Sequence, residues 1–356
     1  MITMSASILG SGIYLPESRK TNDELEKALG LAEGFIKAST GILERRWCTP
    51  DETLEHMASE ASLHAITDAG IDKLERIIIS RDVILTERAR SIGLPILQKL
   101  KTKGIDVDGC FSIDLCNYCP GAIHAMNIAK LMVESGEVEY VLVVAPTRFV
   151  DMICLHKEFN DAVDQEFIPT VQQIRQFSLK DTSMRSYQPP KLNAFLWGNG
   201  AGAIVVGKGI RNGEFISYGA RGSRLFKYDS YGIGEDCRGQ GFGSLDGQSI
   251  YRFAVKEVPE FIADFLHRSG ITEDKISSFI PHQPNPRILK ALAERFPSLE
   301  NKMEITCDTL GNMIGASIPI TYHLARKEGR ITSGDYVLMC SFGDSYLTAS
   351  CLLFKE

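Results

Sequence analysis

The sequence lacks any hydrophobic run long enough to cross a membrane, and it lacks an excess of basic residues. Its formal net charge is −6, with 39 Lys and Arg against 45 Asp and Glu. A general nucleic-acid-binding surface is therefore not expected, because it needs clustered positive charge. A membrane span is not expected either, since it needs about 20 consecutive apolar residues. The first residues show no signal-peptide pattern, so these absences together predict a cytoplasmic protein.

The cysteines lack the even number and the spacing of a disulfide framework. There are nine of them at irregular positions, which indicates reduced thiols. Cys116 and Cys119 form a lone CxxC pair, and no second pair of ligands follows at a spacing that would complete a zinc site. We therefore expect no metal. A redox role for this pair stays open as an alternative, although Pro120 follows the second cysteine instead of lying between the two.

Apolar and polar segments alternate in a way that predicts an α/β protein. Hydrophobic residues make up 44% of the chain, enough for a large core. Buried-strand patterns occur at 6–12, 74–79, 111–115 and 140–145, and helical spacing occurs between them. This alternation favours a largely parallel sheet covered by helices. A further helix over 250–266 contains Pro259, which predicts a kink.

A glycine-rich run, WGNGAGAIVV at 197–206, lacks the Gly-Lys-Ser/Thr ending of a phosphate-binding loop. We interpret it as a turn whose backbone packs closely against a neighbour, followed by a strand.

Cys119 lies where a predicted strand passes into a predicted helix. The segment 110–136 reads CFSIDLCNYCPGAIHAMNIAKLMVESG, and Pro120 suits the first helical position. At this point the unpaired N–H groups and the positive end of the helix dipole favour a thiolate and lower the cysteine pKa. The position therefore predicts a nucleophile, whereas a cysteine taken alone is more often a small buried hydrophobic residue.

A weak internal repeat divides the chain into two halves. The cysteine segment and 308–325, DTLGNMIGASIPITYHLA, share an aspartate, a Gly-Ala pair, a helical pattern and a following Tyr-Val-Leu strand. Asn312 falls close to the position that Cys119 holds in the first half. We expect an N-terminal half at 1–195 and a C-terminal half at 196–356. A polar stretch at 150–193 breaks the alternation and is predicted to be an inserted cap.

Short motifs spread over nearly the whole chain point to one family. In order they are GSGIYLPESRKTNDELEK, STGILERR, DLCNYCPGA, GNGAGAIVV, FIPHQPNPRI, LGNMIGASIP and CSFGDS. With them the chain resembles the β-ketoacyl-acyl-carrier-protein synthase III family of the thiolase superfamily. The resemblance implies a five-layered α/β/α/β/α thiolase-like fold with two duplicated halves, and a homodimer.

The resemblance also assigns chemical roles. It implies that Cys119 is the nucleophile, with His282 of PHQPN and Asn312 of LGN as its partners. Cys119 would take an acyl group from one thioester, and a second, malonyl or β-ketoacyl, thioester would join it in a Claisen condensation. His282 and Asn312 would stabilise the thioester oxygen as it gains charge, and Cys119 and Asp344 would contribute to the oxyanion hole. No cofactor is implied, and the expected partners are acyl-carrier-protein and acyl-coenzyme A thioesters.

Two further residues match positions of interest in the family. Some members of the family join two long acyl chains and take a glutamate of the partner subunit as general base. The resemblance places Glu87 in roughly the loop that supplies it, which crosses the dimer and precedes the cysteine strand. Arg287, in HQPNPRI, matches a position near the tunnel mouth, where it would dock an acidic carrier protein. The alternative for Arg287 is a solvated helix charge.

Several positions depart from the family pattern. Phe35 and Ser39 stand where the family often has a Trp and an Arg that serve coenzyme A, and Met313-Ile314 replace a usual Thr-Ser. With the insertion, these departures predict a specialised relative in secondary metabolism with a reshaped acyl pocket.

Two alternatives to the condensing enzyme stay open. One is an acyltransferase that passes the acyl group from Cys119 to an oxygen or nitrogen nucleophile. The other is a non-catalytic supporting subunit of a heteromeric synthase, against which the intact Cys, His and Asn argue.

Overall fold

The computed structural model describes residues 5–29, 31–49, 51–82, 91–148, 195–209, 214–223, 231–235, 241–245, 247–343 and 347–356. Two predicted site residues, Glu87 and Asp344, lie outside these ranges, as does the predicted insertion at 150–193.

Among the described residues, one mixed sheet of nine strands runs in the order β11-β12-β13-β8-β1-β7-β6-β4-β5. Its strands are β1 (Ala6–Tyr14), β4 (Arg76–Arg81), β5 (Phe111–Cys116), β6 (Tyr140–Thr147), β7 (Gly200–Lys208), β8 (Glu214–Gly222), β11 (Ile276–Pro281), β12 (Tyr336–Gly343) and β13 (Thr348–Lys355). Two short ribbons pair β2 (Arg19–Thr21) with β3 (Glu44–Arg46), and β9 (Tyr231–Glu235) with β10 (Gly241–Leu245).

The expectation of a largely parallel sheet was wrong. Strand β4 is parallel to β5 and β6, and β11 is parallel to β12, but the other described pairings are antiparallel. The physical reason is clearest at β12 and β13, which only a short connection separates. Such a connection can reverse the chain but cannot make the helical crossover that a parallel pair needs.

The strand order divides the sheet into two similar parts. One part is β5-β4-β6-β7-β1 and the other is β8-β13-β12-β11, and a single residue pair, Ser7 with Glu214, joins β1 to β8. In both parts a helix leads into a strand that pairs antiparallel with the next strand, β6 with β7 and β12 with β13. The division at residues 195 and 196 stays a prediction. In the sheet, β7 lies between β1 and β6 and so groups with the strands that precede it.

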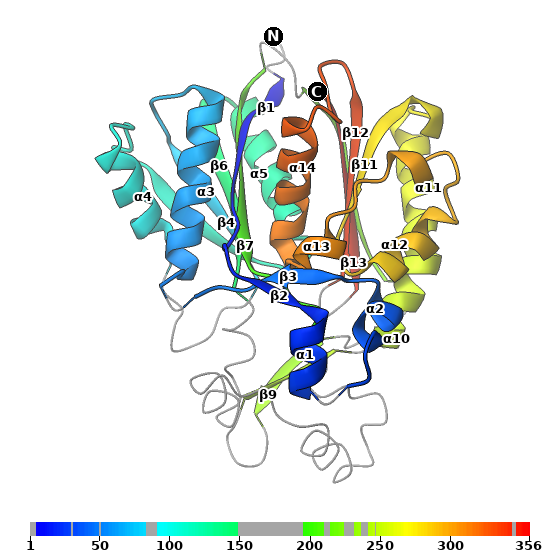
Figure 1. Ribbon diagram of the computed structural model, residues 1–356. Helices are drawn as coiled ribbons and strands as arrows, with labels where there is room; N and C mark the ends of the chain where they lie inside the picture. The colour runs from blue at the N-terminus through cyan, green and yellow to red at the C-terminus, as the bar shows by residue number, and fades with distance from the viewer. Residues whose placement is uncertain are drawn as a thin grey trace.

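Helices lie outside and between the two parts of the sheet, which gives five layers (Figure 1). The first outer layer is α3 (Leu54–Ala69) and α4 (Gly93–Thr102), and the second is α11 (Val258–Ser269) and α12 (Pro286–Ala293). The middle layer is α5 (Gly121–Glu134) and α14 (Ser317–Lys327). Strand β6 is covered on both faces, and this is why it reads as a continuous apolar run and is buried from Val141 to Thr147.

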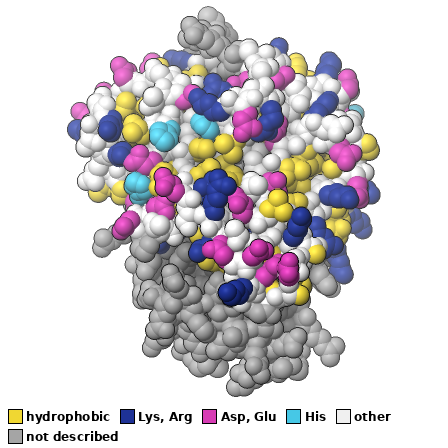
Figure 2. All heavy atoms as spheres, in the orientation of Figure 1, with side chains coloured by type: hydrophobic (Ala, Val, Ile, Leu, Met, Phe, Trp, Pro, Cys, Tyr) yellow, Lys and Arg dark blue, Asp and Glu magenta, His cyan; other side chains and the backbone are white. Residues whose placement is uncertain are grey.

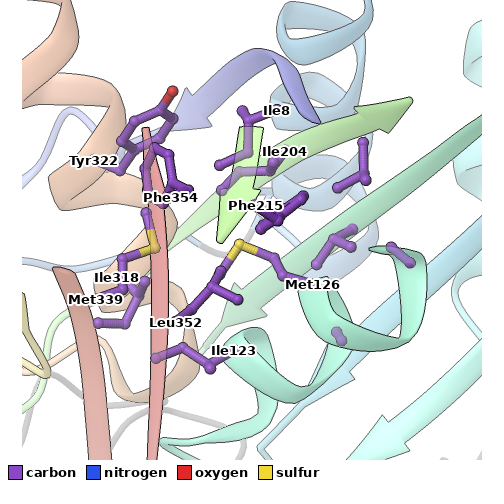
Figure 3. Packing of buried hydrophobic residues seen from close by; sticks show 14 of the residues in the cluster. Ile8, Ile123, Met126, Ile204, Phe215, Ile318, Tyr322, Met339, Leu352 and Phe354 are labelled. Carbon is purple, nitrogen blue, oxygen red and sulfur yellow. The ribbon is translucent and has the colours of Figure 1, made fainter. Parts of the chain in front are cut away.

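The central core packs both middle helices against both parts of the sheet. Figure 3 shows Ile123 and Met126 of α5 facing Leu352 of β13, with Ile318 and Tyr322 of α14 close by. Each of these five side chains is buried. Because α5 and α14 contact strands from both parts of the sheet, the N-terminal ends of these two helices are held in fixed positions relative to each other.

Local sequence signals explain several helix ends. The first helix, α1 (Asn22–Leu29), begins with a capping box in which the Thr21 N–H donates to the Glu24 carboxylate at 2.7 Å. Helix α3 ends at Gly70, which adopts a left-handed φ of 66°. The remaining short helices are α2 (Phe35–Thr40), α10 (Gly247–Arg252), α13 (Cys307–Leu310) and the single turns η2 (Glu273–Lys275), η3 (Glu300–Lys302) and η4 (Ile314–Ala316).

The predicted kinked helix around Pro259 is built differently. Helix α10 passes into a π-helical segment, η1 (Phe253–Glu257), and α11 begins just before Pro259. The proline thus lies in the first turn of α11, where its missing N–H costs no hydrogen bond. None of the helices in the described ranges is long and apolar enough to span a membrane.

Candidate active site

Cys119 lies in the short connection between β5 and α5, as the sequence predicts. Strand β5 ends at Cys116 and α5 begins at Gly121, with Pro120 in the capping position one residue before the helix. Tyr118 adopts a left-handed φ of 45°, which makes the turn before the cysteine sharp. Gly121 packs closely against β4, since a Cβ there would lie 2.3 Å from the Ser80 hydroxyl, which would have to move.

The end of β12 packs directly against Cys119. The hydroxyl of Ser341 donates a hydrogen bond to the carbonyl O of Cys119 at 2.6 Å. A Cβ on Gly343 would lie 3.1 Å from the cysteine Sγ, and the φ of this glycine is 137°. The backbone of Gly343 therefore lies beside the sulfur, immediately before the predicted oxyanion residue Asp344, which is outside the described ranges.

His282 follows β11 and is almost fully buried. The main-chain N–H of His282 donates to the carbonyl O of Cys340 at 2.7 Å. The imidazole ring packs edge to face against the Phe342 ring, with 5.6 Å between the ring centroids. Burial lowers the pKa of His282 to about 3, so the imidazole is neutral at physiological pH. Its Nδ1 has no hydrogen-bond partner in the described part of the chain.

Gln283 is a site residue that the sequence reasoning missed. Its Nε2 group donates to the carbonyl groups of Pro281 and Glu304, at 2.8 and 2.9 Å. Its Oε1 accepts from the N–H groups of Thr306 and Cys307, at 2.9 and 3.2 Å. This buried amide therefore fastens the end of β11 to α13, the helix before Asn312. The signal that could have identified Gln283 is a polar residue next to the histidine at the end of a buried strand.

Asn312 is placed by backbone contacts with the glycine-rich run. Its N–H donates to the Leu196 carbonyl at 2.7 Å, and its carbonyl accepts from Gly198 at 3.0 Å. A Cβ on Gly198 would lie 1.9 Å from the Leu310 carbonyl O, so the predicted close packing of this turn is confirmed. The Asn312 Oδ1 accepts the Ile314 N–H at 2.8 Å, which leaves its Nδ2 group as a donor.

The loops that carry Cys119, His282 and Asn312 lie next to one another. The end of β12 contacts the loops of both Cys119 and His282. The loop of Asn312 reaches the cysteine loop through Gly315, on which a Cβ would lie 3.0 Å from the Tyr118 carbonyl O. The loops of Cys119 and His282 follow the carboxyl ends of β5 and β11, and the loop of Asn312 leads towards the start of α14. Carboxyl ends of strands are the edge where α/β sheets usually bind ligands.

The other predicted site residue that can be placed is Arg287, on α12. It is exposed, and its Nη1 donates to the main-chain carbonyl of Ser39 at 3.0 Å. Arg287 therefore lies beside Ser39, one of the two positions on α2 that depart from the family pattern. The described residues contain no cluster of His, Cys, Asp or Glu that could hold a metal ion.

Comparison with known proteins gives one consistent family. A family model described as 3-oxoacyl-[acyl-carrier-protein (ACP)] synthase III C terminal matches residues 266–354, and one described as 3-oxoacyl-[acyl-carrier-protein (ACP)] synthase III matches residues 113–158. The β-ketoacyl-[acyl-carrier-protein] synthase III of Aquifex aeolicus is 28% identical over 351 residues, which cover 98% of this chain and 99% of the relative.

Solved structures agree with the sequence matches. The crystal structure of 3-oxoacyl-[acyl-carrier-protein] synthase III from Aquifex aeolicus has a TM-score of 0.77 at 28% identity, covering 99% of this chain and 100% of that chain. The priming β-ketosynthase of the R1128 polyketide pathway has a TM-score of 0.79 at 26% identity, covering 99% and 97%.

The mixed α/β fold and these full-length similarities define a thiolase-like condensing enzyme of fatty acid or polyketide biosynthesis. Over nearly its whole length the chain is similar to the β-ketoacyl-acyl-carrier-protein synthase III family, and it is a synthase III-like acyltransferase.

Proposed function

We propose that the enzyme forms a carbon–carbon bond between an acyl group held on Cys119 and a second thioester, malonyl or β-ketoacyl. The observation that carries this proposal is the pair of neutral hydrogen-bond donors in the loops beside the cysteine. His282 is buried and uncharged, and Asn312 has its Oδ1 engaged, so that its Nδ2 group donates. Neutral donors suit an oxygen that gains charge only during the reaction.

In the first step, the Cys119 thiolate attacks the acyl thioester, and the donor thiol leaves. In the second step, a malonyl thioester loses carbon dioxide, and its thioester oxygen becomes an enolate oxygen. His282 and Asn312 donate hydrogen bonds to that oxygen. The enolate carbon then attacks the acyl carbonyl, the bond to the Cys119 sulfur breaks, and the β-ketoacyl thioester is released. One such donor lowers the barrier by about 3 kcal/mol.

The donors we propose are thioesters of coenzyme A or of acyl carrier protein, as for the family. Exposed basic side chains on neighbouring elements support an acidic carrier protein as partner. They come from α2, α10, η1 and α12 and are Lys37, Arg252, Lys256, Arg287 and Lys290. Figure 2 shows Lys and Arg side chains on the right-hand flank, over the region of α11 and α12. Opposite charges on two partners speed their association.

We also propose a homodimer in which β5 of one subunit meets β5 of the other. Strand β5 ends the sheet order, so one of its edges pairs with no described strand. Its side chains Phe111 and Ile113 are 47% and 37% exposed. An exposed apolar edge strand is a site for pairing with another chain. The partner subunit would then supply Glu87 as a general base for substrates that lack a carboxyl group to lose.

Intact-protein mass spectrometry tests the nucleophile. The protein is incubated with a panel of acyl-coenzyme A and acyl-carrier-protein donors, beside Cys119→Ala and the matched control Cys116→Ala. We expect a mass gain that Cys119→Ala abolishes and Cys116→Ala keeps. A gain that persists in Cys119→Ala would refute the assignment.

Addition of malonyl thioester to the acylated enzyme tests the reaction class. A β-ketoacyl product with release of carbon dioxide supports the condensation. Transfer of the acyl group to an oxygen or nitrogen acceptor instead, with no new carbon–carbon bond, would establish the acyltransferase alternative.

A further inference from the structure

A buried carboxyl group, that of Asp82, lies behind the η4 turn. Asp82 directly follows β4 and is 7% exposed. Its Oδ1 accepts a hydrogen bond from the Gly315 N–H at 3.3 Å, and its Oδ2 lies 2.6 Å from the Thr147 hydroxyl. The same hydroxyl lies 2.8 Å from the carbonyl O of Met313. Asp82 and Thr147 thus hold the peptide groups on both sides of Ile314.

The number of hydrogens in this contact decides the protonation of Asp82. Thr147 has one hydroxyl hydrogen, yet its oxygen is within hydrogen-bond distance of both Asp82 Oδ2 and the Met313 carbonyl O. If Asp82 were ionised, Thr147 would donate to it, and its lone pairs would face those of the Met313 carbonyl. A protonated Asp82 donates to Thr147, and Thr147 donates to Met313, so every close contact contains a hydrogen.

The surroundings favour the same state. Burial raises the pKa of Asp82 to about 7, against the hydrogen bonds from Thr147 and Gly315 and the positive charge of Arg81, which lower it. Among the described residues, Arg81, the last residue of β4, is the charged group whose effect reaches this carboxyl. From other elements, the Thr147 hydroxyl of β6 and the Gly315 N–H of η4 face the Asp82 carboxyl group. The Cys116 thiol of β5 lies 3.8 Å from the main-chain carbonyl of Asp82.

The held segment sets the orientation of Asn312. Ile314, a β-branched residue, adopts a left-handed φ of 46°, which such residues rarely accept unless neighbouring groups fix them. The Ile314 N–H is the donor that engages the Asn312 Oδ1 at 2.8 Å. Whatever fixes the backbone at Ile314 therefore also fixes the direction in which the Asn312 Nδ2 group points.

We propose that Asp82 is protonated in the folded enzyme and, with Thr147, is a positioning residue for Asn312 in the condensation step; this role rests on the proposed function. Ionisation of Asp82 turns the Thr147 hydrogen away from the Met313 carbonyl. The backbone of Ile314, which has the left-handed φ, then loses the hydrogen bond that holds its preceding peptide group. The Asn312 amide then loses its alignment with the thioester oxygen. Condensation slows at alkaline pH, whereas acylation of Cys119 does not.

Single-turnover condensation of the preformed acyl-enzyme tests this role across the pH range, because the Cys119 thiol is then already blocked. For the wild type we expect the rate to fall about tenfold for each pH unit above the ionisation of Asp82. Asp82→Asn presents a donor to Thr147 and an acceptor to Gly315, as the protonated acid does. We expect it to keep the wild-type rate within about threefold and to remove the alkaline decline.

A matched pair of variants at Thr147 completes the test. Thr147→Ser keeps the hydroxyl and should keep the rate, whereas the isosteric Thr147→Val should lower it, with acylation of Cys119 unchanged in both. An alkaline decline that persists in Asp82→Asn, or a folded Asp82→Asn that no longer condenses, would overturn the proposal. Equal rates in Thr147→Val and Thr147→Ser would overturn it too.

Infrared difference spectroscopy gives a readout that does not depend on turnover. At neutral and lower pH the wild type should show the carbonyl stretch of a protonated, buried carboxyl group, and Asp82→Asn should lack it. Absence of the band from the wild type would refute the protonation. If the acylated wild type gives no condensation product with any acceptor thioester, the proposed function fails. The infrared spectrum then still decides the protonation state of Asp82.

Discussion

Two buried titratable side chains decide how the site works at the scale of single residues. Burial disfavours the charged form of both, although one is a base and the other an acid: it lowers the pKa of His282 to about 3 and raises the pKa of Asp82 to about 7. The neutral imidazole can donate a hydrogen bond from one ring nitrogen without adding a fixed positive charge. The neutral carboxyl can donate and accept at once, and this is what its two partners require.

Replacing His282 by Ala should separate the two half-reactions. The variant lacks a donor to the developing oxyanion, so we expect condensation to fall about 10²- to 10³-fold. Acylation of Cys119 should remain within tenfold, and His267→Ala, an exposed histidine on α11, should behave as wild type. The measurement is single-turnover kinetics with each step followed by mass spectrometry. Equal losses in acylation and condensation would contradict the role assigned to His282.

The raised pKa of Asp82 predicts a pH-dependent stability. Below about pH 4 the carboxyl is protonated in both folded and unfolded chains. As the pH rises from about 4 to about 7, the unfolded chain ionises while the folded one stays neutral. Wild type should therefore lose stability relative to Asp82→Asn over this window, by up to about 4 kcal/mol. Denaturant unfolding of both proteins between pH 4 and 8 measures it, and a difference that is constant with pH would contradict it.

At the scale of elements, short turns with special backbone geometry place the reactive groups. The cysteine turn contains Tyr118, and η4 begins at Ile314, both with left-handed φ. The turn before β7 holds Asn312 through backbone hydrogen bonds and has no space for a side chain at Gly198. Strands and helices with many buried contacts support these turns, so their geometry depends on packing from several segments.

Gly198→Ala tests whether this turn has the close packing described. The added Cβ would lie 1.9 Å from the Leu310 carbonyl O, so the backbone must move. We expect a loss of about 1–3 kcal/mol in the free energy of unfolding, or more, and weaker condensation through a displaced Asn312. Gly222→Ala is the control, because a Cβ there has no heavy atom of the described residues within 4 Å. Equal stability of the two variants by denaturant unfolding would refute the argument.

At the scale of the whole molecule, two similar parts face each other across α5 and α14. The loop of Cys119 comes from one part and the loops of His282 and Asn312 from the other, so the site exists only when both parts are packed together. The proposed dimer would extend the sheet further through β5.

Ile113→Lys on β5 should break the proposed dimer. A charged side chain on a buried apolar edge would be desolvated without a partner, so we expect the molar mass in solution to halve at micromolar concentration. Ile216→Lys is the matched control, because Ile216 is similarly exposed, at 39%, but lies on β8, far from β5 in the sheet order. Light scattering after size exclusion measures both, and an unchanged mass for Ile113→Lys would rule out this interface.

Glu87→Gln tests the contribution of the partner subunit. If Glu87 is the base that removes a proton from the second thioester, condensation should fall strongly while acylation of Cys119 stays intact. The control is Glu294→Gln, an exposed residue on the surface beyond α12. Unchanged condensation in Glu87→Gln would remove this residue from the mechanism.

The sequence by itself predicted most of the local elements, the resemblance to the synthase III family and the three proposed central residues. Capping boxes, glycine stops and apolar periodicity depend on neighbours in the chain, so the helices at 54–69 and 121–134 could be predicted closely. Cys119 at a strand-to-helix turn is a local pattern as well, and the order of the family motifs can be read along the chain.

The tertiary structure alone decided the strand directions, the charge of His282 and the importance of Gln283 and Asp82. A pKa depends on the burial that distant segments provide, and Asp82 meets Gly315 across 233 positions of sequence. An acidic residue directly after a buried strand was a signal for Asp82, but the signal did not show which groups it would meet. Contacts of this length form only when both halves of the molecule pack around α5 and α14.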